Sequence, residues 1–321
     1  MNNNTGALVI SMDFELLWGV FDKVDWRDKK DYFENTREII PAILKLFDEY
    51  NISCTWATVG MLFNHDWDEW NQNVPVVLPE YENKKLSAYN YGNSIQTKET
   101  EALCFAPDLI KLIKEFQGQE IATHTYSHYY CLEPGQTPIS FKADLEKSKV
   151  VAKKMGIALK SLVFPRNQFN ANYLKECSNT GLETVRTNPS VWYWKDTQKE
   201  SLHQRIIRTG DAYLGFNDKS YKEIAEIYPG IRGQRASRLF RPCSGNTFLD
   251  RMRIKRITSE MSKAAKSKEI YHLWWHPHNF GNYPEKNLQD LRDILNHFKN
   301  LRKKYNFNSY SMIGLNGLIN E

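Results

Sequence analysis

Residues 119–128 read Gln-Glu-Ile-Ala-Thr-His-Thr-Tyr-Ser-His, a short β-like run that ends in two histidines. His124 and His128 are four residues apart, so both imidazoles can lie on one side of a helical turn and converge on one ion. Imidazole nitrogen suits Zn, Ni, Co or Fe, and catalytic zinc sites take three protein ligands and leave one position open. The same spacing is common on ordinary helix surfaces. A metal site therefore needs a third ligand, a base and an acid elsewhere in the chain.

Strands and helices alternate on both sides of this stretch. The predicted strands are 7–12, 53–59, 119–123, 160–164, 184–187, 270–275 and 309–313. The predicted helices are 34–50, 107–117, 140–155, 171–180, 250–267 and 285–304, and we expect the first of them to begin near Pro41. Alternation of this kind predicts a parallel sheet, and over 300 residues it favours a barrel.

Polar side chains gather where the predicted strands end. Asp13 and Glu15 follow the strand 7–12 and point to the same side of an extended chain. Carboxylates at the end of a buried strand are costly unless they are paired, protonated or bound to a metal. The histidine pair, Arg166 and the stretch 276–278 follow three other strands. Parallel barrels carry their chemistry at this end of the strands.

The sequence predicts a single domain over residues 1–321, without internal repeats or a low-complexity linker. The segments 64–100 and 189–250 are poorly patterned, and we expect both to be irregular insertions, the first bordering the active-site mouth. The net charge of +5 is spread along the chain, which argues against nucleic-acid binding. We also expect no membrane segment, because no run of about 18 apolar residues occurs.

The five cysteines are odd in number and show no C-x-x-C spacing, which argues against a disulfide framework and a structural zinc site. The first residues are polar and lack the basic and apolar regions of a signal peptide. We therefore expect a cytoplasmic protein. The oligomeric state is not predicted.

Four motifs occur in a characteristic order. They are Ser-Met-Asp-Phe-Glu (11–15), His-Thr-Tyr-Ser-His (124–128), Phe-Pro-Arg-Asn-Gln (164–168) and Trp-His-Pro-His (275–278). Together they resemble the polysaccharide deacetylase family with the NodB-type domain, and most closely its branch from bacterial surface-polysaccharide gene clusters, over residues 7 to about 315. The resemblance implies a distorted (β/α)7 barrel. It also implies removal of acyl groups from amide nitrogen, or sometimes oxygen, with one divalent metal, commonly zinc.

The resemblance also assigns roles to residues. His124 and His128 match metal ligands, and Asp13 matches the base that takes a proton from water. Arg166 resembles the arginine that orients this base and keeps it ionised. His276 matches the acid that protonates the leaving amine, since an imidazole pKa near 6.5 suits that task.

The sequence departs from the family pattern at the first and third motifs. The family has two adjacent aspartates, the base and then a ligand, whereas here Phe14 stands in the second place and the next acid is Glu15. Either Glu15 or Asp13 can be the third ligand. The family's Arg-x-Pro-x-Gly motif is also altered, so the register of Arg166 is open and Arg241 can compete for its role.

The remaining assignments concern histidines and tryptophans. His276 and His278 are both candidates for the acid, with His276 preferred and His278 otherwise lining the substrate site. His272 and His65 are expected to be structural. Trp192 and Trp194 can stack on a sugar ring or pack in the core.

The leading hypothesis is a metal-dependent hydrolase that removes an N-acyl group, acetyl or formyl, from an amino sugar or a glycan precursor. In the cytoplasm, that precursor would be a nucleotide- or lipid-linked sugar. A hydrolase of linear or cyclic non-sugar amides on the same fold is the alternative. A catalytically degenerate sugar-binding member is a further alternative, because Phe14 occupies a ligand position.

Overall fold

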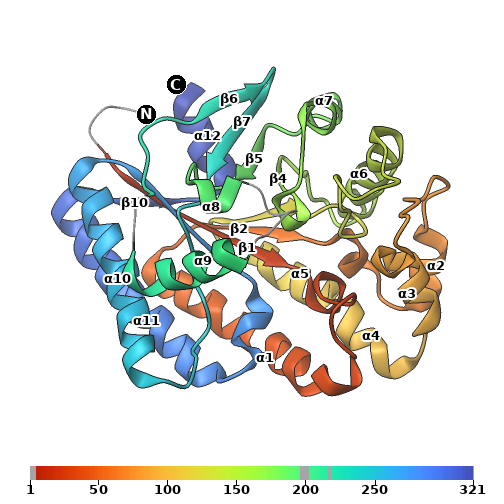
Figure 1. The fold of residues 1–321 in the computed structure, drawn as a ribbon, viewed down its shortest axis with the longest axis horizontal. Coiled ribbons are helices and arrows are strands. Elements are labelled where there is room, and N and C mark those ends of the chain that lie inside the picture. Colours follow the sequence, from red (N-terminus) through yellow and green to blue (C-terminus); the bar gives the residue numbers. More distant parts are fainter. Residues whose placement is uncertain (1–4, 196–201, 216–218, 321) are drawn as a thin grey trace.

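The computed structural model describes residues 5–195, 202–215 and 219–320, and its centre is a sheet of parallel strands (Figure 1). β1 (Ala7–Phe14) lies between β2 (Cys54–Thr58) and β9 (Ile270–Trp275). From β2 the sheet continues through β3 (Gln119–Thr123), β4 (Ser161–Val163) and β5 (Thr184–Thr187), all parallel. Each of β1, β2 and β9 is buried along its whole length, as expected for strands covered on both faces.

One extended segment joins the two ends of this sheet. Its first part, β7 (Ile231–Arg235), pairs with β5, and its second part, β8 (Arg238–Leu239), pairs with β9, both in parallel. Only residues 236 and 237 separate the two parts, and the backbone N–H groups of Ala236 and Ser237 donate to carbonyls of β5 and β9. Within the described residues, the parallel strands therefore form a ring of seven, made of β1 to β5, the β7–β8 segment and β9, which confirms the predicted distorted (β/α)7 barrel.

The distortion has two sources. β6 (Ala225–Tyr228) forms an antiparallel hairpin with β7 outside the ring. β10 (Asn308–Tyr310) pairs with residues 7–9 of β1, while β2 pairs only with residues 11–14. The ring consequently opens at the amino-terminal end of β1.

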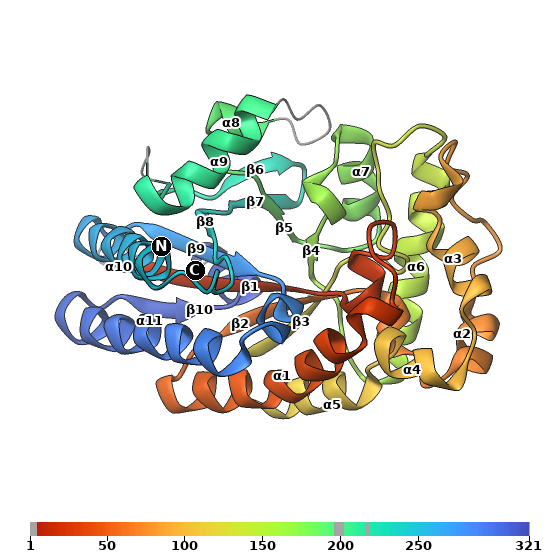
Figure 2. The same cartoon turned by 60° about the horizontal axis from the view of Figure 1, so that its bottom comes forward.

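Helices surround the ring (Figure 2). They are α1 (Lys30–Tyr50), α2 (Trp67–Asn73), α3 (Ala88–Ser94), α4 (Lys98–Cys104), α5 (Pro107–Glu115), α6 (Pro138–Lys154), α7 (Ala171–Asn179), α8 (Trp192–Lys195), α9 (Leu202–Leu214), α10 (Thr247–Ser267), α11 (Pro284–Tyr305) and α12 (Met312–Asn320). Short 3-10 helices lie at η1 (Leu16–Gly19), η2 (Arg27–Lys29), η3 (Gly60–Phe63), η4 (Lys84–Leu86), η5 (Pro165–Asn167) and η6 (Pro277–Gly281). Four of them, η1, η3, η5 and η6, directly follow ring strands. Tight turns therefore follow four of the strands at the carboxyl end of the barrel.

The first long helix begins earlier than predicted. α1 starts at Lys30 and Pro41 lies inside it. Proline removes one helical hydrogen bond, but the buried stripe of α1 begins at Phe33 and continues past Pro41 through Ile43 to Phe47. Burial of such side chains contributes about 1.5–3 kcal/mol each, which outweighs the lost bond.

The two segments predicted to be irregular contain regular structure. Residues 64–100 include α2, α3 and the start of α4, and side chains of Asp66 and Ser87 cap two of these helices. Helices of two turns are too short to show a hydrophobic period, and here caps and aromatic packing stabilise them. Residues 189–250 supply α8, α9, β6, β7 and β8, although residues 196–201 and 216–218 lie outside the described part. The single-domain assignment stays a prediction.

All five cysteines are free and buried, which agrees with the prediction of no disulfide framework. Within the described residues, every helix is too short or too polar to span a bilayer.

Candidate active site

The polar strand ends meet in one cavity of about 780 Å³. Its walls include Asp13 and Glu15 from the end of β1, His124 and His128 after β3, and His276 after β9. Their common position follows from the parallel ring, because the carboxyl ends of all seven strands lie at one end of the barrel.

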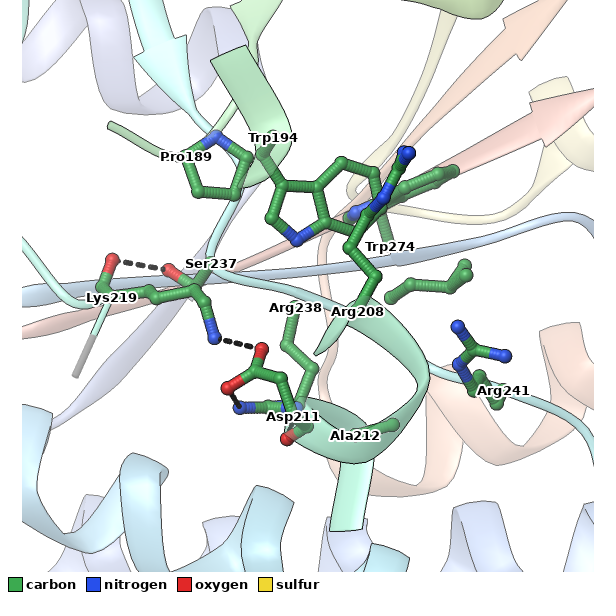
Figure 3. Close-up of a pocket in the computed structure, with 11 residues that line it drawn as sticks. Pro189, Trp194, Arg208, Asp211, Ala212, Lys219, Ser237, Arg238, Arg241 and Trp274 are labelled. Carbon is green, nitrogen blue, oxygen red and sulfur yellow. Dashed lines mark hydrogen bonds and ion pairs between the residues drawn. The ribbon is translucent and has the colours of Figure 1, made fainter. Parts of the chain in front are cut away.

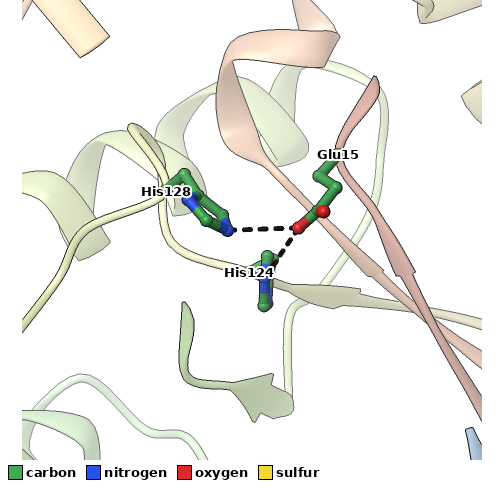
Figure 4. Close-up of side chains that lie close together, drawn as sticks. All are labelled: Glu15, His124 and His128. Atoms are coloured by element: carbon green, nitrogen blue, oxygen red, sulfur yellow. Dashed lines mark ion pairs between the residues drawn. The ribbon is translucent and has the colours of Figure 1, made fainter. Parts of the chain in front are cut away.

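Glu15, His124 and His128 form a compact buried cluster (Figure 4). The Glu15 Oε2 atom lies 3.3 Å from His124 Nε2 and 3.1 Å from His128 Nε2. Tetrahedral zinc with bonds of about 2.0–2.1 Å places neighbouring ligand atoms about 3.3 Å apart. The three donors therefore fit a single zinc-sized ion.

The other ring nitrogen of each histidine is held by the protein. His124 Nδ1 lies 2.8 Å from the Val163 carbonyl oxygen, which can only accept, so Nδ1 is the donor in this hydrogen bond. His128 Nδ1 lies 3.0 Å from the Tyr130 hydroxyl. Burial lowers the pKa of His128 below its usual value. Both rings can thus present an Nε2 lone pair to a metal, the arrangement typical of metal-ligating histidines.

A loop, and not the predicted helical turn, brings the two histidines together. β3 ends at Thr123, and both Thr125 (φ 64°) and His128 (φ 54°) have left-handed backbone conformations. The carboxylate of Asp144 on α6 accepts hydrogen bonds from the backbone N–H groups of Tyr126 and Ser127 and from the Ser127 hydroxyl. This buried carboxylate fixes the loop, and burial raises its pKa to about 6.

Left-handed residues also occur in two other turns at this end of the barrel. Leu16 (φ 44°) directly follows Glu15, and Arg166 (φ 54°) and Asn167 (φ 52°) follow β4. None of them is glycine, so each conformation costs of order 1–3 kcal/mol and persists only because the surroundings enforce it. Such strain is concentrated at functional sites.

Arg186 on β5 holds Asp13 in a bidentate ion pair. Its Nη1 and Nη2 atoms lie 2.6 and 2.7 Å from the two carboxylate oxygens, and Nη1 also donates to Ser11 Oγ at 3.1 Å. Burial alone would raise the pKa of Asp13, but Arg186, with His124 and His276, keeps it below its usual value. Arg186 therefore has the contact that the sequence analysis assigned to Arg166.

The prediction that Arg166 orients the base is thus wrong. Arg166 ion-pairs with Asp22 at 2.5 Å and Glu133 at 3.4 Å, and its guanidinium lies 3.9 Å above the Tyr130 ring. It covers the tyrosine that contacts His128 at the wall of the cavity. Arg241, the other candidate, lines a neighbouring recess.

The two carboxylates of β1 are separated by an apolar side chain that points away from them. Phe14 is buried in the core, with its ring edge-to-face against Trp56 at 6.2 Å. Glu15 returns to the cavity side and takes the place beside the histidines, whereas Asp13 is engaged by Arg186. Glu15 is therefore better placed than Asp13 to be a third ligand.

His276 and His278 differ in exposure. His276 Nε2 lies 3.7 Å from Asp13 Oδ2 and 3.6 Å from Glu15 Oε1, and a quarter of its side chain is exposed to the cavity. His278 is buried against the rings of Tyr32 and Phe33, and burial lowers its pKa to about 3. His278 also lines the cavity, but His276 is the more exposed of the two and is better placed to reach a bound substrate. His272 is also buried and is hydrogen-bonded to Ser11. His65 is exposed and pairs with Glu69. Both positions agree with the structural roles expected for these two histidines.

The two predicted sugar-stacking tryptophans lie in different surroundings. Trp194 lines the cavity and lies edge-to-face with Trp274, a further wall residue that the sequence analysis missed. Trp192 is largely exposed and is not among the described wall residues. The described wall also contains no residue of 64–100, so this insertion does not border the mouth. The insertion instead supports the loop after β3, because the Tyr81 hydroxyl accepts a hydrogen bond from the backbone N–H of Tyr130.

Sequence reasoning missed Arg186, Tyr130 and Asp144. Arg186 had a usable signal, since an arginine inside a predicted strand of a parallel sheet is expected to be buried and then needs an anion. The sequence gives no comparable signal for Tyr130 and Asp144, because their hydrogen-bond partners depend on the conformation of the loop that carries His124 and His128.

A seven-stranded parallel barrel with two histidines and two carboxylates at the strand ends is the arrangement of the NodB-type barrel. The family model described as polysaccharide deacetylase matches residues 17–185, more than half of the chain, and the chain belongs to this family. The matched range begins after Glu15 and ends before His276. The positions of these two residues in the site are therefore known from the structure and not from the family match. No curated protein sequence matches the chain.

Solved structures share the fold at low sequence identity. A protein described as a polysaccharide deacetylase from Mycobacterium smegmatis is 14% identical with a TM-score of 0.60, over 93% of this chain and 85% of its own. One from Pseudomonas aeruginosa PAO1 is 8% identical with a TM-score of 0.56, over 95% and 87%. The allantoinase PuuE is 11% identical with a TM-score of 0.56, over 96% and 88%. At these identities the likeness concerns the fold alone.

Proposed function

We propose that the protein is a metal-dependent hydrolase that removes an N-acyl group, acetyl or formyl, from an amino sugar or a glycan precursor. The observation that carries this proposal is the convergence of Glu15, His124 and His128 beside the Asp13–Arg186 pair in one cavity. Membership of the polysaccharide deacetylase family supports the carbohydrate substrate.

Glu15, His124 and His128 would hold the metal, and their nitrogen and oxygen donors suit zinc best, with Ni, Co or Fe as further candidates. A divalent ion there would polarise the acyl oxygen and make water a stronger acid. The fixed Nδ1 contacts of the histidines prepare the site for such an ion, because no ring has to rotate to bind it.

Asp13 would be the general base. Arg186 binds both carboxylate oxygens and keeps the group ionised, so Asp13 is ready to accept a proton from the attacking water. Because Arg186 also contacts Ser11 and lies 4.2 Å over the Trp274 ring, the base has little freedom to move. Proton transfer then needs no reorganisation of the carboxylate.

His276 would be the general acid. Its Nε2 faces Asp13 and Glu15 across the cavity, and its partial exposure lets it approach the nitrogen that leaves. The His278 ring stacks on the His276 ring with centroids 5.0 Å apart and so restrains its plane. The C–N bond would break as His276 gives its proton to the leaving nitrogen, so that the products are the free amine and the carboxylic acid. The proton that Asp13 takes from water would then restore the proton of His276.

Metal content and acyl release test the proposal together. Purified protein should contain about one equivalent of zinc, or acquire it after chelation, and should release acetate or formate from acylated amino sugars. Asp13→Asn should keep the metal and lose turnover, whereas His128→Ala should lose both. Asp31→Asn and His65→Ala, at exposed positions, are the matched controls.

The outcome also separates the alternatives. A protein that cannot acquire any divalent metal contradicts the proposal and favours a sugar-binding role. Turnover of simple amides without turnover of amino sugars favours the amide hydrolase. Loss of metal in Asp13→Asn would make Asp13 a ligand and remove it as the base.

A further inference from the structure

Ser11 and His272 form a buried polar pair directly below the catalytic cavity. Ser11 lies two residues before Asp13 on β1, so both side chains point to the interior of the ring. His272 has the same relation to Trp274 on β9, which lines the cavity. Both side chains of the pair are fully buried, and Ser11 Oγ lies 2.8 Å from His272 Nε2. Burial of polar groups costs free energy, so the pair needs a reason to be there.

The hydrogen bonds of this pair form a chain with a fixed direction. A guanidinium can only donate, so Arg186 Nη1 donates to Ser11 Oγ at 3.1 Å. Within the described residues, Ser11 Oγ has one other hydrogen-bond partner, which is His272 Nε2. The Ser11 proton therefore goes to this nitrogen, and His272 accepts. A neutral imidazole is required for this, and burial lowers the pKa of His272 to about 3.

The imidazole of His272 makes no other hydrogen bond within the described part of the chain. Its Nδ1 atom is buried and has no partner there. The backbone of His272 is held separately, because its N–H donates to Ser237 Oγ and its carbonyl oxygen accepts from the Ser237 N–H. An apolar side chain at this position would avoid the cost of a buried, unpaired N–H group. The imidazole thus contributes one thing that an apolar side chain cannot, an acceptor for Ser11.

The contact from Ser11 restricts a motion that the Asp13–Arg186 pair retains on its own. Two parallel hydrogen bonds of 2.6 and 2.7 Å join the carboxylate and the guanidinium, but such a pair can still swing as one unit. The guanidinium carbon lies 4.2 Å from the centre of the Trp274 ring, which limits tilting toward that side. Figure 3 shows this tryptophan at the wall of the adjoining recess. The N–H bonds of a guanidinium lie in its plane, so Ser11 restrains the swing within that plane.

We propose that Ser11 and His272 are positioning residues that hold the Arg186 guanidinium, and through it the Asp13 carboxylate, in place for proton transfer. This role rests on the proposed function, in which Asp13 is the base. His272 orients the Ser11 hydroxyl so that a lone pair faces Arg186. Without this acceptor, the hydroxyl proton is free to turn toward the guanidinium and weaken the contact.

Ser11→Ala tests the positioning of the base. A displacement of about 1 Å at a reacting group costs up to about 100-fold in rate. For the metal-loaded protein we expect kcat of acyl release to fall about 10–100-fold. KM should stay within about twofold, because Ser11 is too deeply buried to touch a substrate. Ser11→Thr keeps the hydroxyl and should retain most of the activity. The substrates are N-acetylglucosamine, N-formylglucosamine and their 1-phosphates.

Two changes at His272 separate its hydrogen bond from its volume. His272→Gln offers an amide oxygen as the acceptor and should retain more of kcat than His272→Leu, which offers none. In the Ser11→Ala background, His272→Leu should lower kcat by at most about a further twofold, because no hydroxyl proton remains to be accepted. Equal values of kcat for His272→Gln and His272→Leu contradict the role of His272.

A second serine–histidine pair provides the control. Ser262 Oγ lies 2.7 Å from His297 Nε2 between α10 and α11, and neither residue is among the described walls of the cavity. Ser262→Ala should leave kcat and KM unchanged. Circular dichroism and metal content of each variant must match those of the wild type. A folded, metal-loaded Ser11→Ala protein with the wild-type kcat overturns the proposal, and so does a change confined to KM. If Ser11→Ala does not fold, the two His272 variants decide.

Acyl release by the wild type separates this inference from the proposed function. If the wild type releases no acyl group from any of the four sugars, the proposed function fails, and urea unfolding with a chelator present tests the contact without turnover. Ser11→Ala should then lower the ratio of folded to unfolded protein about tenfold. In the Arg186→Met background the same change should lower it at most about twofold, because the charged donor to the serine is gone. Such a difference supports the contact, whereas equal effects in both backgrounds show that Ser11 does not hold Arg186 and overturn the proposal.

Discussion

Asp13 and Arg186 should be strongly coupled in folding, because each compensates the buried charge of the other. The two groups are almost fully buried and joined by contacts of 2.6 and 2.7 Å. Removing one partner of a buried pair costs about 3–5 kcal/mol, because the other charge remains buried without compensation. Arg186→Met should therefore lower the free energy of unfolding by about 3–5 kcal/mol, and Asp13→Asn by a similar amount.

The double variant should cost much less than the sum of the two single changes. Once both charges are gone, neither desolvation penalty remains, so a coupling energy of at least about 2 kcal/mol is expected. Urea unfolding followed by tryptophan fluorescence measures all four proteins. A chelator should be present throughout, because a metal bound only to the folded state would add its own stabilisation.

A surface pair provides the control cycle. Arg27 and Asp25 are ion-paired at 3.3 Å with both side chains more than half exposed, so their coupling should be below about 1 kcal/mol. Additive effects of Asp13→Asn and Arg186→Met, within about 0.5 kcal/mol, would refute the reasoning. So would a cost below about 1 kcal/mol for Arg186→Met.

Three further predictions concern the cluster of Glu15, His124 and His128 and the loop that carries the two histidines. Gly19→Ala should lower zinc affinity at least about tenfold, because the added methyl group would overlap the Glu15 carboxyl group. Equilibrium dialysis measures this affinity. The control is Gly317→Ala, where the methyl group meets open space. Tyr130→Phe removes the hydroxyl bound to His128 Nδ1 and should weaken zinc binding by about 10–100-fold. The same change at the exposed Tyr283 should leave zinc binding unchanged. Equal zinc affinities of wild type and Tyr130→Phe would show that the hydroxyl does not support the site. Burial raises the pKa of Asp144 from 3.8 to about 6, so the folded state holds its proton more tightly and the protein should lose up to about 3 kcal/mol of stability as pH rises from about 4 to 6. Asp144→Asn should remove this part of the pH dependence in urea titrations, and an unchanged profile would contradict the raised pKa.

The strands at the centre of the ring could be predicted because each is buried and apolar along its length. The segment that closes the ring could not. Ile-Arg-Gly-Gln-Arg at 231–235 has no apolar run, and it is a strand because β5 binds its backbone. One of its buried polar side chains, Gln234, donates to the Met312 carbonyl oxygen, which offsets part of the free-energy cost of burying its amide group. This partner cannot be identified from the sequence alone.

The arginine partner of Asp13 was missed for a related reason. β1 and β5 are not neighbours in the sheet, so Arg186 reaches Asp13 across the interior of the ring. Contacts of this kind depend on ring closure, which in turn depends on β7 and β8. The motif containing Arg166 supplied an arginine near the correct end of the barrel, but the left-handed turn at Arg166 and Asn167 directs its side chain to Asp22 and Tyr130.

The departure at Phe14 can be explained by the two-residue period of β1. In an extended strand, Asp13 and Glu15 share the cavity side, and Phe14 has to point into the core, where it packs on Trp56. The position that follows Asp13 can therefore carry a hydrophobic residue, provided that the next residue supplies the second carboxylate. This substitution requires the chain to turn sharply at once, and Leu16 does so with a left-handed conformation. It also requires space for the longer glutamate side chain, which Gly19 provides because it has no Cβ atom. The sequence Asp-Phe-Glu thus retains a carboxylate beside the two histidines only in combination with the turn at 16–19, so the altered motif does not by itself indicate a degenerate site.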